Sequence, residues 1–462
     1  MSAPLYVVHA IDTEGPLYES LEATFERIRF IVGVELEPTR ANLARLRRRE
    51  LDLGGAEETA ALVVSEPLLA YNDTWDKVDA MLRDMLGRAY RQTYADSEGN
   101  GWIYSWFLVD HVGYDTNPRR RDIGYHNVFD HYLAMLRETA SSQDDVQFHF
   151  HPMSTYREAH VCATSYLRSP HLLETLARRV IDRAWFPSCF RPGFHAERPD
   201  AHWFLEQWIP FDFANQATDA DDASQRDVAA GRLGDWRRAP SDWSHYRPHH
   251  DDYQRPGSCR RTVFRCLNVG TRFRLLDGDE VARAFERADA GHPTVLAFTN
   301  HDFRDMRPDV AATHALIADT ARRFPRVPWR HARALDAARA VLGRSEAPAL
   351  QLDVRITHTN GITKLDVASQ RPTFGPQPFL AIKTLDRRYL TDNLDIHEPH
   401  HRWSYVFDAD TVPIRAVERV GVASNDVNGA THVVTLDSAG GDRIEAAPGA
   451  LSSELRAFAP SE

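Results

Sequence analysis

Two short motifs carry side chains that could bind a metal ion together. The segment VHAIDTEGPL places Asp12 and Glu14 directly before a Gly-Pro pair, and the segment FHFHP contains His149 and His151. In an extended strand, residues two apart point to the same side, so each motif can present both of its side chains to one point. Two imidazoles and one carboxylate are a common ligand set for zinc, iron or cobalt, and the set leaves positions for water and substrate.

Further polar side chains stand where other apolar runs end. Asp110 and His111 follow GWIYSWFLV, Arg191 follows WFPSCF, and His301 follows PTVLAFTN. In α/β sheets and barrels the carboxyl ends of the strands face the ligand site. A solvated acidic turn or packed histidines would explain each motif alone, but their repetition at successive run ends favours one shared site.

The elements expected to position these residues alternate between strands and helices. Buried strands are predicted at 4–11, 101–109, 145–152, 210–215 and 293–300, and helices at 74–92, 169–184, 277–290 and 308–323. Asp73 is the expected cap of the first helix, and Ser169 with Pro170 the expected start of the second. This alternation predicts a mostly parallel sheet or barrel of the α/β class.

The chain divides into regions of different texture. Residues 1–344 carry the strand and helix alternation, interrupted at about 17–98 by a segment with helical patterns and no sheet period. Residues 345–462 instead show short alternating runs separated by Gly, Asn and Pro, which predicts a separate all-β module.

Composition narrows the class of partner. The chain has 462 residues, of which 43% are hydrophobic and 26% charged, and a formal net charge of −11. That charge argues against nucleic acid or an anionic membrane surface as the main partner and favours a neutral or cationic small substrate. The first strand begins about five residues after Met1, and no later apolar run approaches spanning length, so we expect a cytoplasmic protein without a membrane span. Four scattered cysteines without a CxxC pair predict reduced, mostly buried thiols.

The order of the motifs IDTEGP, FHFHP, FRPG and NHD resembles that of the polysaccharide deacetylase superfamily, metal-dependent carbohydrate esterases of the chitooligosaccharide deacetylase type. The resemblance covers about residues 4–340 and implies a distorted (β/α) barrel. The second motif departs from the family, which spaces its two histidines four apart, because position 153 here is Met153. We take His151, which precedes Pro152 as the family's second ligand precedes a proline, as the substitute.

The resemblance also implies roles for the residues that match its motifs. Asp12 would be the catalytic base, Arg191 the arginine that orients it, and His301 the catalytic acid. The metal ligands would be Glu14, His149 and His151. If His151 faces away, His111 or Asp110 becomes the third ligand.

The resemblance implies a hydrolase that removes an acetyl or formyl group from an aminosugar, in a small-molecule or oligosaccharide substrate that is a precursor in surface polysaccharide biosynthesis. Zinc is the expected metal, with iron or cobalt as alternatives. Asp110, His111 and His126 are expected near the substrate, and the oligomeric state, including a homo-oligomer, stays open. The competing hypotheses are a hydrolase of a small non-sugar amide with the same metal centre, and an inactive carbohydrate-binding or scaffold protein.

Overall fold

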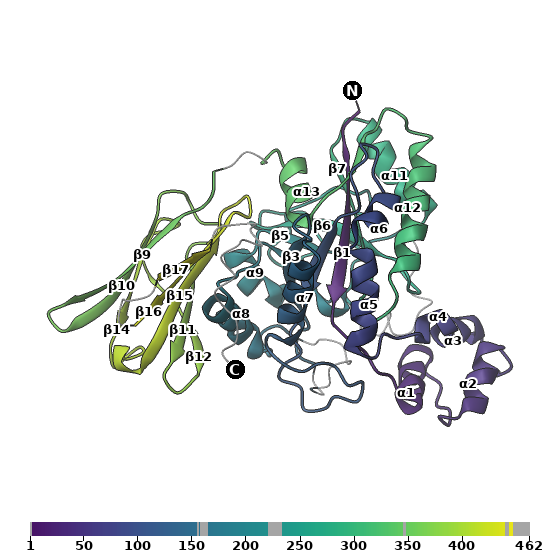
Figure 1. Cartoon of the computed structure of the whole chain (residues 1–462), viewed down its shortest axis with the longest axis horizontal. Helices are drawn as coiled ribbons and strands as arrows, with labels where there is room; N and C mark the ends of the chain where they lie inside the picture. Colours follow the sequence, from purple (N-terminus) through teal and green to yellow (C-terminus); the bar gives the residue numbers. More distant parts are fainter. Residues whose placement is uncertain are drawn as a thin grey trace.

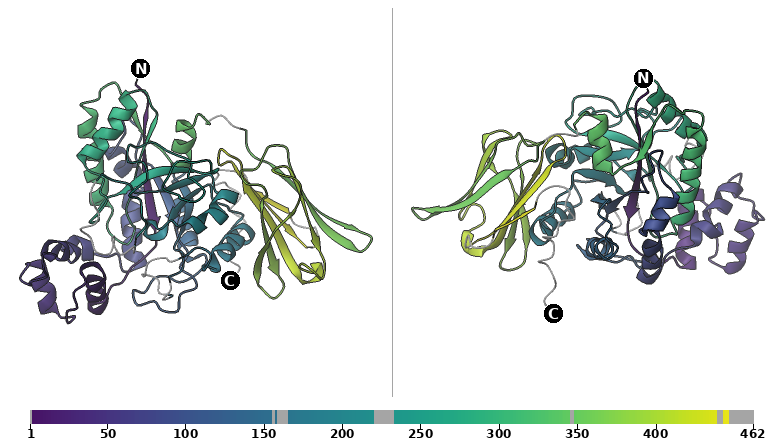
Figure 2. Two further views of the ribbon diagram at one scale, coloured as in Figure 1. Left: turned by 180° about the vertical axis from the view of Figure 1, so that it is seen from behind. Right: turned by 45° about the horizontal axis from the view of Figure 1, so that its top comes forward.

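The structure is a computed structural model that describes residues 2–154, 157, 165–219, 233–344, 348–438 and 443–446. It consists of a barrel with surrounding helices, a small group of helices beside it, and a β-rich part on the opposite side (Figures 1 and 2). The sequence of the small helical group interrupts that of the barrel, whereas the β-rich part follows the barrel along the chain.

Parallel strands form a closed barrel of seven. They are β1 (Leu5–Thr13), β2 (Tyr104–Leu108), β3 (Asp145–Phe150), β4 (Cys189–Pro192), β5 (Phe211–Asn215), β6 (Thr262–Asn268) and β7 (Thr294–Thr299). Each strand pairs with the next, and β1 closes the ring by pairing with both β2 and β7. A short strand, β8 (Trp329–His331), pairs with the first residues of β1. The predicted α/β class is therefore confirmed as a closed parallel barrel with helices.

Helices surround the barrel, as the predicted alternation requires. They are α5 (Trp75–Met85), α6 (Arg88–Thr93), α7 (Asn127–Glu138), α8 (His171–Arg183), α9 (His202–Trp208), α11 (Gly278–Asp289), α12 (Arg307–Ala321) and α13 (Ala334–Val341). The strands are buried along nearly their whole length, which matches their continuous apolar character.

Two predicted helix starts are wrong in detail. The helix expected at 74–92 begins after Thr74 rather than after Asp73, and it is two helices, α5 and α6, separated at Gly87. Asp73 instead forms an ion pair with Lys77 at 2.7 Å. Helix α8 begins after Pro170, and the Ser169 hydroxyl accepts a hydrogen bond from the Met153 backbone N–H at 2.6 Å instead of capping the helix.

The segment at 17–98 contributes to two different cores. Helices α1 (Leu21–Val32), α2 (Arg40–Arg47), α3 (Glu57–Val63) and α4 (Glu66–Leu69) share a small apolar cluster of their own. Helices α5 and α6 lie against the barrel, where Val78, Met81 and Leu82 pack in the same cluster as Trp106 of β2. Only the first half of the predicted insertion therefore stands apart from the barrel (Figure 1).

Antiparallel sheets make up the C-terminal region, which agrees with the predicted all-β character. One sheet contains β9 (Leu352–Thr359), β10 (Ile362–Ser369), β13 (Asp395–Glu398) and β14 (Arg402–Phe407). The other contains β11 (Phe379–Thr384), β12 (Tyr389–Asp392), β15 (Val417–Asn425), β16 (Thr431–Asp437) and β17 (Arg443–Ala446). Side chains from both sheets share one apolar core, so the two sheets form a sandwich.

The sandwich is fixed to the barrel by apolar packing and by one buried asparagine. Phe379 and Ala423 belong to the same cluster as Val180 of helix α8. The Asn425 side-chain amide donates to the backbone carbonyls of Pro187, at 2.7 Å, and Trp208, at 2.8 Å. The sandwich and the barrel therefore share buried contacts instead of being joined by a linker alone.

We expect Asn425→Ala to lower the free energy of unfolding by about 2–4 kcal/mol, because it leaves two buried carbonyls without donors. Chemical denaturation followed by far-UV circular dichroism measures the change. The control is Asn393→Ala, which removes an exposed asparagine with one side-chain hydrogen bond. Equal stability of the two variants would show that this asparagine does not hold the sandwich.

Candidate metal centre

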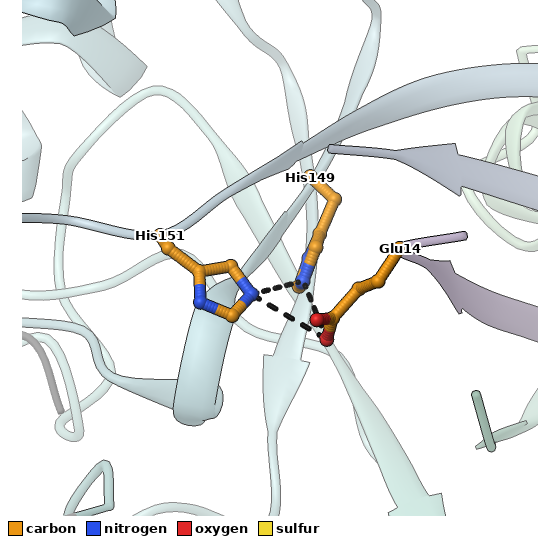
Figure 3. Close-up of side chains that lie close together, drawn as sticks. All are labelled: Glu14, His149 and His151. Atoms are coloured by element: carbon orange, nitrogen blue, oxygen red, sulfur yellow. Dashed lines mark hydrogen bonds and ion pairs between the residues drawn. The ribbon is translucent and has the colours of Figure 1, made fainter. Parts of the chain in front are cut away.

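Glu14, His149 and His151 meet at the carboxyl ends of β1 and β3 (Figure 3). His149 Nε2 lies 3.9 Å from Glu14 Oε1, and His151 Nε2 lies 3.5 Å from the same oxygen. The two Nε2 atoms are 3.1 Å apart. Since no residue of the three is more than 7% exposed, the cluster is a buried one that could hold a metal ion. Glu14 and His149, which the sequence predicts to share one ion, are therefore close enough to do so.

The spacing of the three ligand atoms fits a small divalent ion. Ligands bound tetrahedrally at about 2.0–2.1 Å lie roughly 3.3 Å from one another. The three observed separations of 3.1, 3.5 and 3.9 Å bracket that value. The donor set of two imidazoles and a carboxylate suits zinc, iron or cobalt.

The surroundings of His149 direct the lone pair of its Nε2 toward the cluster. Its Nδ1 lies 3.0 Å from the backbone carbonyl oxygen of Arg191, which can only accept a hydrogen bond. Nδ1 therefore carries the proton, and Nε2 presents a lone pair, the arrangement that a second hydrogen bond gives metal-binding histidines. Burial lowers the pKa of His149 to about 4, so the ring is neutral at pH 7.

Glu14 is held on both its backbone and its side chain. The Asp302 carboxylate accepts the backbone N–H groups of Glu14 and Gly15, each at 2.8 Å. Gly15 has a φ of 71°, and a Cβ there would lie 2.9 Å from the Trp75 ring, so the turn after β1 requires glycine. Arg121 Nη2 lies 2.6 Å from Glu14 Oε2. Burial favours the neutral acid, but Arg121 and His151 outweigh it and hold the pKa of Glu14 well below its usual range.

Asp12 and Arg191 form a buried pair beside this cluster. Arg191 donates to both carboxylate oxygens of Asp12, at 2.6 and 3.0 Å. Asp12 Oδ1 lies 3.6 Å from His149 Nδ1. Burial raises the pKa of Asp12, but the charge and hydrogen bonds of Arg191, together with His149 and His301, outweigh that effect and lower it. Asp12 is therefore an oriented carboxylate next to the Glu14–His149–His151 cluster.

His301 completes the group from the end of β7. Its Nε2 lies 3.8 Å from Asp12 Oδ2 and 3.7 Å from Glu14 Oε1. Its side chain is 26% exposed, so it is the most accessible of the site residues predicted at the ends of these strands. Burial lowers the pKa of His301, whereas Asp12 and Glu14 act to raise it.

The three predicted substrate-binding residues all have protein partners. Asp110 forms an ion pair with Arg179, and burial raises its pKa to about 7. His111 Nε2 lies 3.3 Å from the Glu14 backbone carbonyl. His126 is bonded to Asp182, at 3.0 Å, and to Arg179, at 2.8 Å. Their proposed role at the substrate stays a prediction.

Neither alternative third ligand competes with His151. The Asp110 carboxylate is engaged by Arg179, and the His111 ring centre lies 6.0 Å from that of His151. The metal-capable cluster contains His151 and neither alternative. The substitution of a histidine two residues from His149 for the family's wider spacing is thus compatible with a single cluster.

Gly193 sets the position of His151 through close packing. A Cβ at this glycine would lie 2.4 Å from His151 Cδ2 and 2.9 Å from its Cα. We expect Gly193→Ala to displace the ring and weaken zinc binding by about 10-fold or more, as other changes behind a ligand do. Competition with a chelator measures the affinity, and Gly278→Ala, where the nearest atom would be 3.7 Å away, is the control. Unchanged affinity in Gly193→Ala would show that the His151 ring does not bind the ion.

A second group of metal-ligating types, His202, Glu206 and Cys259, is filled by an arginine. Arg261 Nη1 lies 2.7 Å from both His202 Nδ1 and Glu206 Oε1, so the guanidinium stands between these atoms. This group is therefore an ion-pair network and not a second ion site.

The cysteines behave as expected where they are described. Cys189, Cys259 and Cys266 are free thiols, and Cys189 and Cys266 are buried. Cys162 lies outside the described residues.

Sequence reasoning missed Arg121 and the bonding role of Asp302. Arg121 lies in the run PRRRD, whose composition is that of an ordinary basic turn. Asp302 follows His301 at the end of an apolar run, a position where a polar residue is expected without any specific contact. Neither signal shows that both residues contact Glu14.

Among the described residues, no helix combines the length and the apolar composition that a membrane span needs. Compared with known proteins, the chain matches no protein-family model, no curated protein and no solved structure.

Proposed function

We propose that this protein is a metal-dependent hydrolase that removes an N-acyl group from an aminosugar. The proposal is carried by one observation: a buried Glu14–His149–His151 cluster stands within 4 Å of both an arginine-bound carboxylate and a partly exposed histidine. Amide hydrolysis requires a polarised carbonyl, a base for water and an acid for the leaving amine. Three separate strand ends supply side chains suited to these tasks.

The residues of the chain divide the work as follows. Glu14, His149 and His151 would hold the ion, which when bound lowers the pKa of its water toward neutrality and polarises an acyl carbonyl. Asp12 accepts the proton of the attacking water. Arg191 keeps Asp12 ionised and fixes its orientation, which is the usual effect of an opposite charge on a carboxylate. His301, the most exposed of these residues, donates a proton to the departing amine.

The resemblance of the motif order to polysaccharide deacetylases supports a sugar amide over a simple amide. In this proposal the substrate is an N-acetyl or N-formyl aminosugar, carried as a precursor of a surface polysaccharide. A small non-sugar amide would use the same ion and the same proton donors and acceptors, so the choice between the two substrate classes depends on the substrate test.

The test combines metal analysis with a substrate panel. Purified protein is analysed for zinc, iron and cobalt, then assayed for amine release from N-acetylated and N-formylated nucleotide sugars and from simple amides. We expect one ion per chain, loss of amine release with a chelator, and recovery when metal is returned. A chain that takes up no stoichiometric metal would contradict the proposal and favour a binding or scaffold role. If amine is released from simple amides alone, the substrate is a small non-sugar amide and not an aminosugar.

A further inference from the structure

Arg121 contacts the side of the Glu14 carboxylate that faces away from the histidines. Arg121 Nη2 lies 2.6 Å from Oε2. The contacts of Glu14 with His149, His151 and His301, at 3.9, 3.5 and 3.7 Å, all involve the other oxygen, Oε1. The two oxygens therefore have separate environments: Oε1 faces the imidazoles and Oε2 faces a guanidinium.

The position of Arg121 is fixed by contacts of its backbone and of its side chain. The Asn117 side chain accepts from the Arg121 backbone N–H and donates to its carbonyl, both at 2.8 Å. The guanidinium carbon lies 4.9 Å from the centre of the Phe303 ring, and the Arg121 side chain is 4% exposed. The arginine is thus fixed at its backbone and along its side chain, so its contact with Glu14 does not depend on a mobile surface group.

The remaining donors of Arg121 show that the arrangement is not an optimised ion pair. Nε and Nη1 are buried and make no hydrogen bond, and Glu14 Oε2 also makes none, so the 2.6 Å contact through Nη2 is an ion pair without hydrogen-bond geometry. A buried donor without a partner destabilises the fold, and such a cost in a native structure calls for a reason. A purely structural pair would gain from a bidentate contact like that of Arg191 with Asp12, which uses two nitrogens.

We infer that Arg121 is a positioning residue that makes Glu14 a one-oxygen metal ligand by occupying Oε2. This inference rests on the proposed metal centre. Two histidines and one oxygen fill three positions of a tetrahedral ion and leave the fourth for water or substrate. A carboxylate with both oxygens free can instead bind an ion through both of them. Arg121 therefore keeps the fourth position open.

The same contact should weaken metal binding. A guanidinium in contact with the ligand carboxylate repels a divalent cation, because like charges this close interact strongly in a buried site. Removing that charge and freeing Oε2 both favour tighter binding. The structure thus assigns Arg121 an effect opposite to that of a residue whose only task is to keep the ligand in place.

The experiment compares Arg121→Met with the wild-type chain and two matched variants. Zinc affinity is measured by competition with a chelator, and coordination by the visible absorption of the cobalt-substituted protein. In Arg121→Met we expect zinc binding that is at least about 10-fold tighter. We also expect a weaker visible absorption of the cobalt-substituted protein, because a higher coordination number lowers that absorption. In Arg121→Lys, which keeps a cation, we expect values close to wild type.

Arg304→Met is the control for charge alone. Arg304 lies over the same Phe303 ring, at 5.1 Å, and its Nε donates to the Leu68 carbonyl instead of contacting Glu14. We expect a smaller change in zinc affinity than in Arg121→Met and an unchanged cobalt spectrum. An equal gain in both variants would overturn the inference, because the effect would then not require contact with Glu14.

The outcomes separate this inference from the proposed function. Normal metal uptake by the wild type, together with equal or weaker binding in Arg121→Met, overturns the inference alone. A wild-type chain that takes up no ion overturns the proposed function and this inference together. If Arg121→Met does not fold, Arg121→Gln removes the same charge and is measured against the same expected gain.

Discussion

The variant Asp12→Asn is expected to lose turnover by on the order of 100- to 10,000-fold, the usual contribution of a general base, while it keeps its metal. Asparagine has nearly the same shape as aspartate but cannot accept the proton of the attacking water. The Asp12 carboxylate is not part of the Glu14–His149–His151 cluster, so zinc stoichiometry should stay at the wild-type value. The measurement is kcat on the substrate found in the panel, with metal content determined on the same sample.

The control for this variant is Asp145→Asn. Asp145 begins β3, at the end of the strand opposite His149 and away from the ligand cluster. Like Asp12→Asn, this variant replaces a carboxylate by an amide of nearly the same shape. Because Asp12→Asn leaves Arg191 with a neutral partner, and breaking a buried pair costs about 3–5 kcal/mol, thermal denaturation must show that the assayed variant is folded. A folded variant with more than about one tenth of wild-type turnover would exclude Asp12 as the base.

The variant Glu14→Ala is expected to lose metal binding. It removes the one carboxylate ligand and leaves two imidazoles, with the Arg121 charge no longer compensated. We expect the zinc dissociation constant to rise by on the order of 100-fold or more, toward the upper end of what changes at a metal site produce. Turnover should fall at limiting zinc. Chelator competition measures the affinity.

The control variant, Glu19→Ala, removes another buried acid and shows how far a general loss of stability affects zinc binding. Glu19 has a side chain that is 2% exposed and pairs with Arg27, at 2.9 Å, and Arg119, at 3.2 Å. Glu19→Ala should therefore destabilise the chain without changing zinc affinity. If Glu14→Ala kept the wild-type affinity for zinc, Glu14 would be excluded from the ligand set. The two histidines would then have no carboxylate beside them as a ligand.

The candidate site could be predicted from the sequence because its residues stand in local patterns. The pairs Asp12–Glu14 and His149–His151 each sit two residues apart at the end of an apolar run. Strand periodicity places both members of such a pair on one side, and a barrel brings the strand ends to one face. Those two facts suffice to predict that the acids and the imidazoles meet.

The parts that escaped prediction depend on contacts between distant segments. Strand β6 is interrupted by Arg265, a charge that lowers its apolar signal, yet in the fold this arginine pairs with Glu280 at 2.6 Å. The break between α5 and α6 falls at Gly87, within a pattern that reads as one helix. Arg121 lies in a loop whose sequence has no periodic pattern. Only the closed barrel brings that loop to Glu14, so the contact could not be predicted.

The order of the site residues along the chain has a consequence for biosynthesis. The three residues of the metal-capable cluster stand at the ends of β1 and β3, which are both neighbours of β2, and all precede residue 152. Arg191 and His301 arrive later, and β1 gains its β7 partner only then. Since a nascent chain emerges from its N-terminus, the three residues of the cluster are made before Arg191 and His301. Under the proposed function, a partly made chain would hold the groups for an ion before it held the full set of groups for proton transfer, which needs the last barrel strand.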